Sequence, residues 1–490
     1  MNGTTPLLRR NKRGLDRMKQ GSRYRFYMHE AERGDMPGPD TCGDFMPFFH
    51  QGVYHLFYLH KYCVYEVATT DFVHYGEPRL AIPCGSPEDQ DWHIGTGSVV
   101  EREGVFHFYY TGFNESNRDC AGKHEQVLMR AVSTDLVHWE KDASYCVTPD
   151  TEHYGGLHWR DPQVFWNDRE REYWMAVTAT EKDGDHNRGG CTHIMKSSDL
   201  QSWRPGTAIY APGTFATHEC HDIFQMGEWW YMIFSNYTRW WETRYRMANS
   251  PAGPWITPAA DDMFDGRAFY AAKTVSNGTN RYLVGWQAIR SGMDDKKPYQ
   301  WGGSALVHEL VQRPDGTLGV KPVQALAESY RRARPQAAVA HRGTWTFQNG
   351  VRGSEPYGFG WAEVGSMREA CMVKAKLRWA PGTLACGLML HIGGPRLEKW
   401  CQVRLEPARN RVVFDRSNKF DGDQMFIEER YVSLAGTNEA EVKVFVNGNA
   451  IIIYVNDTAL ATRAYDYEPG GCGIFVEHGE AEFLELDILE

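Results

Sequence analysis

The chain has 490 residues and a net charge of −10, from 63 acidic and 53 basic side chains. This charge excludes the basic surface that nucleic-acid binding needs, and a hydrophobic content of 42% excludes a wholly disordered chain. The sequence contains no run of about 18 apolar residues, so we predict no membrane-spanning helix. We therefore expect neither a nucleic acid nor a membrane as a partner. The 48 Gly, 17 Trp, 25 Tyr and 23 Phe indicate a turn-rich β protein.

The first segment, 1–34, is predicted to be a basic N-terminal arm. Between positions 6 and 25 it carries eight Lys or Arg residues against the single acid Asp16, a pattern typical of a solvated segment. The apolar core of a secretory signal does not follow it. The 11 Cys are odd in number and form no CxxC pair. Together these features predict reduced thiols and a cytoplasmic protein.

Segment 35–325 contains an internal repeat. A strand pattern rich in aromatic residues occurs five times, at 52–58, 104–110, 171–177, 227–234 and 280–286. A turn pattern lies between the copies, and its aspartates Asp71, Asp135 and Asp199 are 64 residues apart. A unit of this size, with its own turn and aromatic anchor, is typical of a propeller blade. The repeat predicts a five-bladed β-propeller whose first strands line a central channel.

The remaining chain differs in pattern. Segment 326–342 is rich in Ala and Arg and is predicted to be a short helical linker. Segment 343–490 returns to strands, with a hairpin predicted around Asn447-Gly448 and alternating apolar residues near the C-terminus. We interpret it as a β-sandwich. The predicted fold class is therefore all-β, a five-bladed β-propeller followed by a β-sandwich.

Three acids stand at similar positions in three blades. Asp44, Asp161 and Glu219 precede the central aromatic residue of their own blade's strand pattern by 10, 12 and 11 residues. Equivalent blade positions lie at equal depth around the axis, so these acids are expected to converge at one mouth of the channel. Crowded acids differ in pKa, which is the division of roles that glycosidic cleavage requires. Asp40 competes with Asp44 for the first of these positions.

Several short motifs together resemble glycoside hydrolase family 32. They are Arg160-Asp161-Pro162, Glu219-Cys220, the strand 52–58, Gly95-Thr96-Gly97-Ser98, and Phe269-Tyr270 with Gly285-Trp286. The resemblance implies a retaining double displacement on β-fructofuranosides by hydrolysis or fructosyl transfer. It implies Asp44 as nucleophile, Glu219 as acid/base and Asp161 as the acid that binds ring hydroxyls. Retention places the two reacting carboxyl groups roughly 5–5.5 Å apart.

Further residues are candidates for contact with a carbohydrate substrate. They are Arg160, which would orient the carboxylates, and Trp92, His93, Ser98, Trp159, His60, Cys220 and Trp286. Trp92, His93 and Trp159 could equally be core aromatics. Segment 218–222 could be read as a set of metal ligands. However, strand alternation would send His218 and Cys220 to one side and Glu219 and His221 to the other, so we expect neither metal nor cofactor.

The motifs also depart from the family pattern. The family's Asn beside the nucleophile is missing, Leu59-His60-Lys61 replaces a Gln, and His218 and His221 replace Trp and Pro. These changes touch the pocket that would hold the sugar and leave the substrate open. An inverting furanosidase of the family 43 type, acting on arabinosyl or xylosyl units, is the alternative, and a non-catalytic sugar-binding propeller is the third. The sequence also leaves room for a homo-oligomer.

Overall fold

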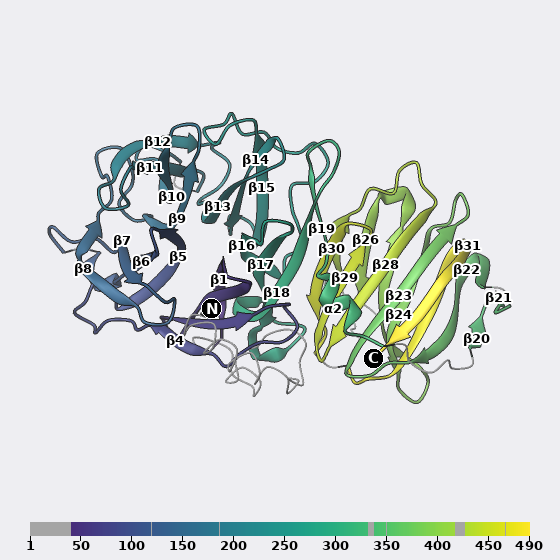
Figure 1. Cartoon of the computed structure of the whole chain (residues 1–490). Coiled ribbons are helices and arrows are strands. Elements are labelled where there is room, and N and C mark those ends of the chain that lie inside the picture. The colour runs from purple at the N-terminus through teal and green to yellow at the C-terminus, as the bar shows by residue number, and fades with distance from the viewer. Residues whose placement is uncertain are drawn as a thin grey trace, which may run out of the picture.

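The structure is a computed structural model that describes residues 41–490 except 119, 186, 332–337, 349, 417–426 and 466. The predicted arm 1–34 and Asp40 lie outside the described residues. The described chain forms two β domains side by side, drawn in purple to teal and in green to yellow in Figure 1. Among the described residues, no helix is long and apolar enough to span a bilayer.

The first domain is a propeller of five antiparallel sheets within the described residues (Figure 1). Its strands, blade by blade, are β1 (Gly43–His50), β2 (Val53–His60), β3 (Cys63–Thr69) and β4 (Arg79–Ile82); β5 (His93–Arg102), β6 (Val105–Phe113), β7 (Gln126–Ser133) and β8 (Glu140–Val147); β9 (Arg160–Asn167), β10 (Glu172–Thr180), β11 (Gly190–Ser197) and β12 (Arg204–Tyr210); β13 (Glu219–Met226), β14 (Trp229–Asn236) and β15 (Glu242–Ala248); β16 (Phe269–Ser276), β17 (Arg281–Arg290), β18 (Tyr299–Gln312) and β19 (Leu318–Pro322). The predicted five-bladed propeller is confirmed.

The repeated aromatic pattern forms the second strand of each blade. These strands pack between the faces of neighbouring blades, so β2, for example, is buried at every residue. That double burial explains why the pattern is a continuous apolar run rather than an alternation. The first strand of each blade faces the axis, and the three acids lie at the starts of β1, β9 and β13.

The turn pattern forms a tight turn after the third strand of three blades, and the same hydrogen bonds hold it in each. The carboxylate of Asp135 accepts the backbone N–H groups of Val137 and His138, each at 2.8 Å. Asp71 and Asp199 accept the corresponding pairs in their own blades. An aspartate that binds the backbone two and three residues ahead stabilises a tight turn, which is why this residue recurs at a fixed spacing.

The second domain is a β-sandwich, as predicted. Its described strands are β20 (Val339–Arg342), β21 (Thr344–Thr346), β22 (Val351–Ser366), β23 (Ala370–Trp379), β24 (Ala385–Gly393), β25 (Lys399–Glu406), β26 (Arg411–Asp415), β27 (Ile427–Tyr431), β28 (Glu439–Asn447), β29 (Ala450–Val455), β30 (Thr458–Arg463) and β31 (Gly471–Leu489). β31 pairs with β24 through its first half and with β23 through its second, so one strand joins both halves of the sheet. The hairpin β28–β29 turns through Gly448-Asn449, one residue later than the predicted centre.

The two domains share a core. Phe445, Ile452 and Tyr454 of the sandwich belong to the same buried cluster as the inner residues of blades 1, 4 and 5. Helix α2 (Gln324–Glu328) follows β19, and Leu326 of this helix is buried in that cluster. The predicted linker 326–342 therefore includes the end of α2 and also β20, which pairs with β22.

Candidate active site

A bulge occurs at the start of the axis-facing strand in each described blade. The pairing register shifts there in β1, β5, β9, β13 and β16. Four residues at these bulges have a left-handed backbone: Asp44 (φ 48°), Asp161 (φ 58°), Cys220 (φ 53°) and Ala271 (φ 52°). A bulge re-aims the side chains on either side of it, which is why bulges are common beside active sites.

The bulges correct the expectation that the three acids occupy one equivalent position. Asp44 and Asp161 are the left-handed residues of their bulges, whereas Glu219 precedes the left-handed Cys220 by one residue. Glu219 therefore corresponds to Arg160 in blade 3 and to Tyr270 in blade 5. The spacing of 10, 12 and 11 residues concealed this offset because the connections to the second strand differ in length.

Asp44 is held by two hydrogen-bond donors. Trp286 Nε1 donates to its Oδ1 at 3.0 Å, and Thr96 Oγ1 donates to its Oδ2 at 2.9 Å. Burial raises the pKa of Asp44 to about 6, because the two hydrogen bonds only partly offset the desolvation and the charges of Asp161 and Glu219 add to it. At neutral pH this carboxyl group is mostly ionised and oriented.

Asp161 is more deeply buried than Asp44. Its Oδ2 accepts hydrogen bonds from Thr178 Oγ1 at 3.1 Å and from the backbone N–H of Cys220 at 3.0 Å. Its own N–H donates to Thr111 Oγ1 at 2.9 Å. Burial raises the pKa of Asp161, against the nearby charge of Arg160. These bonds tie blades 2, 3 and 4 together around one carboxylate.

Glu219 receives one donor on each oxygen. Arg160 Nη2 lies 2.7 Å from its Oε1, and Tyr270 Oη donates to its Oε2 at 2.5 Å. Burial lowers the pKa of Arg160, but the nearby carboxylates of Glu219 and Asp161 outweigh burial, so the pKa of Arg160 is raised. Arg160 therefore joins two of the three acids, and its role in orienting them for catalysis stays a prediction.

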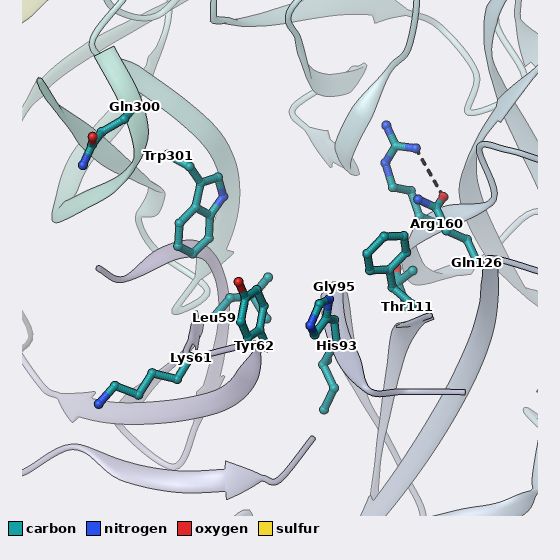
Figure 2. Close-up of a pocket in the computed structure, with 12 residues that line it drawn as sticks. Leu59, Lys61, Tyr62, His93, Gly95, Thr111, Gln126, Arg160, Gln300 and Trp301 are labelled. Atoms are coloured by element: carbon teal, nitrogen blue, oxygen red, sulfur yellow. Dashed lines mark hydrogen bonds between the residues drawn. The ribbon is translucent and has the colours of Figure 1, made fainter. Parts of the chain in front are cut away.

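A cavity opens beside these residues, with a volume of about 490 Å³. Figure 2 shows Arg160 and Gln126 on one side, Trp301 on the other, and Tyr62 and His93 between them. Of the predicted contact residues, Arg160 and His93 line this cavity. The ring of Trp92 stacks on that of His93, with centroids 4.6 Å apart.

Four other candidates have structural contacts. Trp159 is only 1% exposed and packs with Tyr154 and His193, so it is a core aromatic. His60 is also 1% exposed and bonds to the carbonyl of Thr41. Ser98 Oγ donates to Pro162 O at 2.9 Å and accepts from Val164 N–H at 3.0 Å, which clamps blade 2 to blade 3. Trp286 is fully buried and acts on Asp44 through its indole N–H.

The expected alternation around Glu219 is wrong. His218 Nδ1 and His221 Nε2 both lie within hydrogen-bond distance of the same atom, Thr192 Oγ1, at 3.1 and 2.8 Å. Cys220 instead points toward the site, with its Sγ 3.6 Å from Thr96 Oγ1. The physical reason is the left-handed bulge at Cys220, which breaks the period of two. Among the described residues, no group of three or more His, Cys, Asp or Glu side chains is arranged to hold a metal ion.

Thr96 and Tyr270 are further functional candidates, because both lie in the family motifs although the sequence predicts no role for either. Thr96 Oγ1 donates to Asp44, and Tyr270 Oη donates to Glu219. The sequence pattern carries no signal for them, because their equivalence shows only in the bulge register: Thr96 in blade 2 and Tyr270 in blade 5 occupy the blade positions of Asp161 and Glu219. Trp241 also belongs to the site, because its ring packs against Tyr270 and Trp286.

A five-bladed propeller that gathers three carboxylates and an arginine at one mouth of its channel has the fold and site of a glycoside hydrolase. The family model described as "Glycosyl hydrolases family 32 N-terminal domain" matches residues 45–322, which is more than half of the chain. The chain therefore belongs to glycosyl hydrolase family 32, and the predicted resemblance is confirmed.

Individual relatives cover most of the chain at low identity. Sucrose-6-phosphate hydrolase of Escherichia coli is 23% identical over 450 residues, 85% of this chain and 83% of the relative. Levanbiose-producing levanase of Bacillus subtilis is 28% identical over 250 residues, 46% of this chain and 42% of the relative. The solved structure of exo-inulinase from Aspergillus awamori superposes with a TM-score of 0.72 at 15% identity and covers 96% of this chain and 99% of its own. These matches support one fold along both domains.

Proposed function

We propose that the protein is a retaining glycosidase that cleaves β-fructofuranosides. The observation that carries the proposal is the pairing of two differently held carboxyl groups at one mouth of a family 32 propeller. Asp44 has a raised pKa of about 6 and two neutral donors, whereas Glu219 is bonded to the cation of Arg160. Two acids in unlike environments can divide the roles of nucleophile and proton donor. A raised pKa is usual for a proton donor, so it is the family 32 motifs, and not this pKa, that assign Asp44 as nucleophile and Glu219 as acid/base.

The reaction follows from these roles. A carboxylate oxygen of Asp44 bonds to the anomeric carbon of the fructosyl unit while the bond to the leaving oxygen breaks. Glu219 gives its proton to that oxygen. In the second step Glu219 takes a proton from water or from a second sugar hydroxyl. The oxygen of that water or hydroxyl then bonds to the anomeric carbon and displaces Asp44, so both acids return to their starting states. Asp161, tied to Thr178 and Cys220, would accept hydrogen bonds from ring hydroxyls.

Relatives suggest the bond that is cleaved. Matched proteins are named sucrose-6-phosphate hydrolase, levanbiose-producing levanase and fructan 6-exohydrolase, and each of these names describes the hydrolysis of a fructose-containing sugar. We extend this class to the present chain, including transfer to an alcohol. All eleven cysteines are free thiols, which supports a location in the reducing cytoplasm.

The decisive experiment combines a substrate screen with two variants. Purified protein is incubated with sucrose, fructo-oligosaccharides, methyl β-fructofuranoside and an arabinofuranoside, and products are identified by NMR. Asp44→Asn and Glu219→Gln should each lower kcat on the fructosides by at least about 10³-fold, since each removes a group that acts in the transition state. Glu228→Gln, an exposed acid in the β13–β14 turn of the same blade, is the control and should leave kcat unchanged.

The stereochemistry separates the remaining classes. In methanol, a retaining enzyme converts sucrose to methyl β-fructofuranoside with the β configuration kept, whereas an inverting one cannot form that product. Cleavage of the arabinofuranoside in preference to all fructosides would contradict the proposal and favour the family 43 type. Sugar binding without turnover by the parent protein would favour a non-catalytic propeller.

A further inference from the structure

The segment that carries Glu219 leaves the regular ladder of its blade. The pairing of β13 with β14 passes from Glu219 directly to Asp222, so Cys220 and His221 together face one residue of β14. Two residues opposite one form a bulge, which bends the strand and re-aims the side chains beside it. The direction of Glu219 therefore depends on the contacts that anchor this bulge.

Two histidine rings on either side of Glu219 are anchored on one hydroxyl group. His218 Nδ1 lies 3.1 Å and His221 Nε2 lies 2.8 Å from Thr192 Oγ1, which belongs to β11 of the neighbouring blade. All three side chains are fully buried. The histidines stand one position before and two positions after Glu219. We call Thr192 and these two rings the histidine clamp, and it spans the acid.

Both rings of the clamp are uncharged at neutral pH. Burial lowers the pKa of His218 to about 3, and the charge of Arg246 adds to this effect. Burial also lowers the pKa of His221 far below its usual value, and His218, Lys273 and Arg160 lower it further. The clamp is therefore a set of neutral hydrogen bonds and not an ion pair.

Sharing one hydroxyl group couples the hydrogen positions of the two rings. A neutral imidazole has one N–H and one lone pair, and Thr192 has one hydroxyl hydrogen. If Thr192 donates to His218 Nδ1, His218 carries its hydrogen on Nε2, and His221 donates to Thr192 through its own Nε2. If Thr192 donates to His221 Nε2, both rings carry their hydrogen on Nδ1. The other nitrogens, His218 Nε2 and His221 Nδ1, are buried without a partner among the described residues.

The backbone of the bulge has anchors of its own. Thr178 Oγ1 donates to His218 O at 2.6 Å, and Lys273 Nζ donates to His221 O. Loss of the Thr192 hydroxyl group leaves these two bonds in place, so the bulge should still form. The rings would lose their shared partner, and the segment between them would be free to shift. A displacement of a catalytic group by about 1 Å can cost about 10²-fold in rate.

We propose that Thr192, His218 and His221 are positioning residues that hold Glu219 in line with the leaving oxygen. This inference rests on the proposed function, which gives Glu219 the role of proton donor. It adds three residues that make no contact with the sugar. His218 and His221 stand where the family pattern has Trp and Pro, so the pattern does not supply this clamp.

The test compares two fructosides that differ in their need for a proton donor. Methyl β-fructofuranoside releases a basic alkoxide that must be protonated, whereas 4-nitrophenyl β-fructofuranoside releases a stable phenolate. Thr192→Val keeps the shape of the side chain and removes the hydroxyl group. It should lower kcat/KM at least about tenfold for the methyl compound and less than about threefold for the nitrophenyl compound, because a displaced acid weakens only proton transfer. Equal losses on both compounds, or no loss, would overturn the proposal.

Two further variants separate positioning from packing. Thr192→Ser restores the hydroxyl group and should return kcat/KM for the methyl compound to within about threefold of the parent. Thr69→Val is the control, since Thr69 is also fully buried and its Oγ1 accepts the backbone N–H of Phe72 in the turn of blade 1. It should leave the ratio of the two kcat/KM values unchanged. Thr192→Ser as impaired as Thr192→Val, or the same altered ratio in Thr69→Val, counts against the proposal.

A measurement on the parent protein tests the clamp without turnover. NMR of protein with isotope-labelled histidine reports at pH 7 which ring nitrogen carries the hydrogen, and the signals lost in His218→Phe and His221→Phe assign the two rings. We expect two neutral rings with matching tautomers, both Nε2–H or both Nδ1–H. Opposite tautomers, or a charged ring, would overturn the proposal even if Thr192→Val folds poorly.

Glu219→Gln separates this inference from the proposed function. It removes the proton donor itself, so it should show the same selective loss on the methyl compound, and a larger one than Thr192→Val. If Glu219→Gln shows that loss and Thr192→Val does not, the inference fails and the proposed function stands. If Glu219→Gln leaves both compounds unaffected, the proposed function fails in its assignment of Glu219, whereas matching tautomers would still support the clamp.

Discussion

Asp44 shows how opposing effects set the charge of one residue. Burial and the neighbouring acids Asp161 and Glu219 raise its pKa, while the donors Trp286 and Thr96 lower it, and the balance is a pKa of about 6. In its proposed role as nucleophile, Asp44 can act only when it is ionised. Activity therefore depends on how well the two donors stabilise the anion.

This balance predicts the acid limb of the pH profile. The kcat/KM should fall about tenfold per pH unit below pH 6, as Asp44 becomes protonated. Trp286→Phe removes a donor to the anion, so the pKa of Asp44 should rise and the limb should move to higher pH. The measurement is kcat/KM for a fructoside between pH 4 and 8.

The control for that variant is Trp174→Phe. Trp174 is also buried, in blade 3, and its Nε1 makes no hydrogen bond among the described residues. Trp174→Phe should lower the free energy of unfolding without moving the acid limb of the pH profile. A limb that stays in place in Trp286→Phe would contradict the role of the indole N–H.

At the scale of the element, the bulge in the axis-facing strands is the feature that builds the site. It places Asp44 and Asp161 in a left-handed backbone that Asp accepts at small cost, and it aims Glu219 and Tyr270 at each other. In blade 5 the same position is Ala271 (φ 52°), whose Cβ is strained there.

This strain predicts unequal costs for two neighbouring glycine substitutions. Ala271 and Ala272 are both fully buried, so each substitution removes one methyl group and adds the same freedom to the unfolded chain. Only Ala271→Gly also relieves the left-handed strain. It should therefore lower the free energy of unfolding by about 1–2 kcal/mol less than Ala272→Gly does, measured by urea titration. Equal losses would show that the bulge is unstrained in blade 5.

At the scale of the whole molecule, the sandwich supports the propeller through buried contacts. Arg463 in β30 is 1% exposed and donates to Ala288 O, Gln287 O and Ser304 Oγ of blade 5, each at 2.8 Å. These acceptors flank Trp286, whose indole holds Asp44. The second domain thus fixes the strand that positions the proposed nucleophile.

The interface predicts that replacing a buried arginine lowers the free energy of unfolding much more than replacing an exposed arginine of the same domain. Arg463→Met keeps most of the volume but leaves buried acceptors unpaired, so the free energy of unfolding should fall by about 3 kcal/mol or more. Arg378→Met, on an exposed pair with Glu439 in the same domain, should change the free energy of unfolding far less, because solvent screens that pair. Chemical unfolding followed by fluorescence measures both. A small loss in Arg463→Met would show that the domains are only loosely coupled.

The fold can be predicted from the sequence because the repeat is local. Residues such as Asp135 and the aromatic run of β2 act within one blade, so their spacing is visible along the chain. Asp44, Asp161 and Glu219 can be predicted as a group for the same reason. The sequence did not distinguish Trp159, which is core, from His93, which lines the cavity, because both are rings near strand starts and only packing separates them.

The sequence by itself determined the five-bladed propeller, the sandwich, the family and the three acids. These depend on periodic burial and on short motifs, which the chain order preserves. Only the tertiary structure decided the offset of Glu219, the two donors on Asp44, the part of Tyr270 and the cavity. Each of these depends on contacts between residues of different blades, which lie 51 to 242 positions apart in the chain for the bonds to Asp44 and Glu219, and on backbone bulges that have no mark in the sequence pattern.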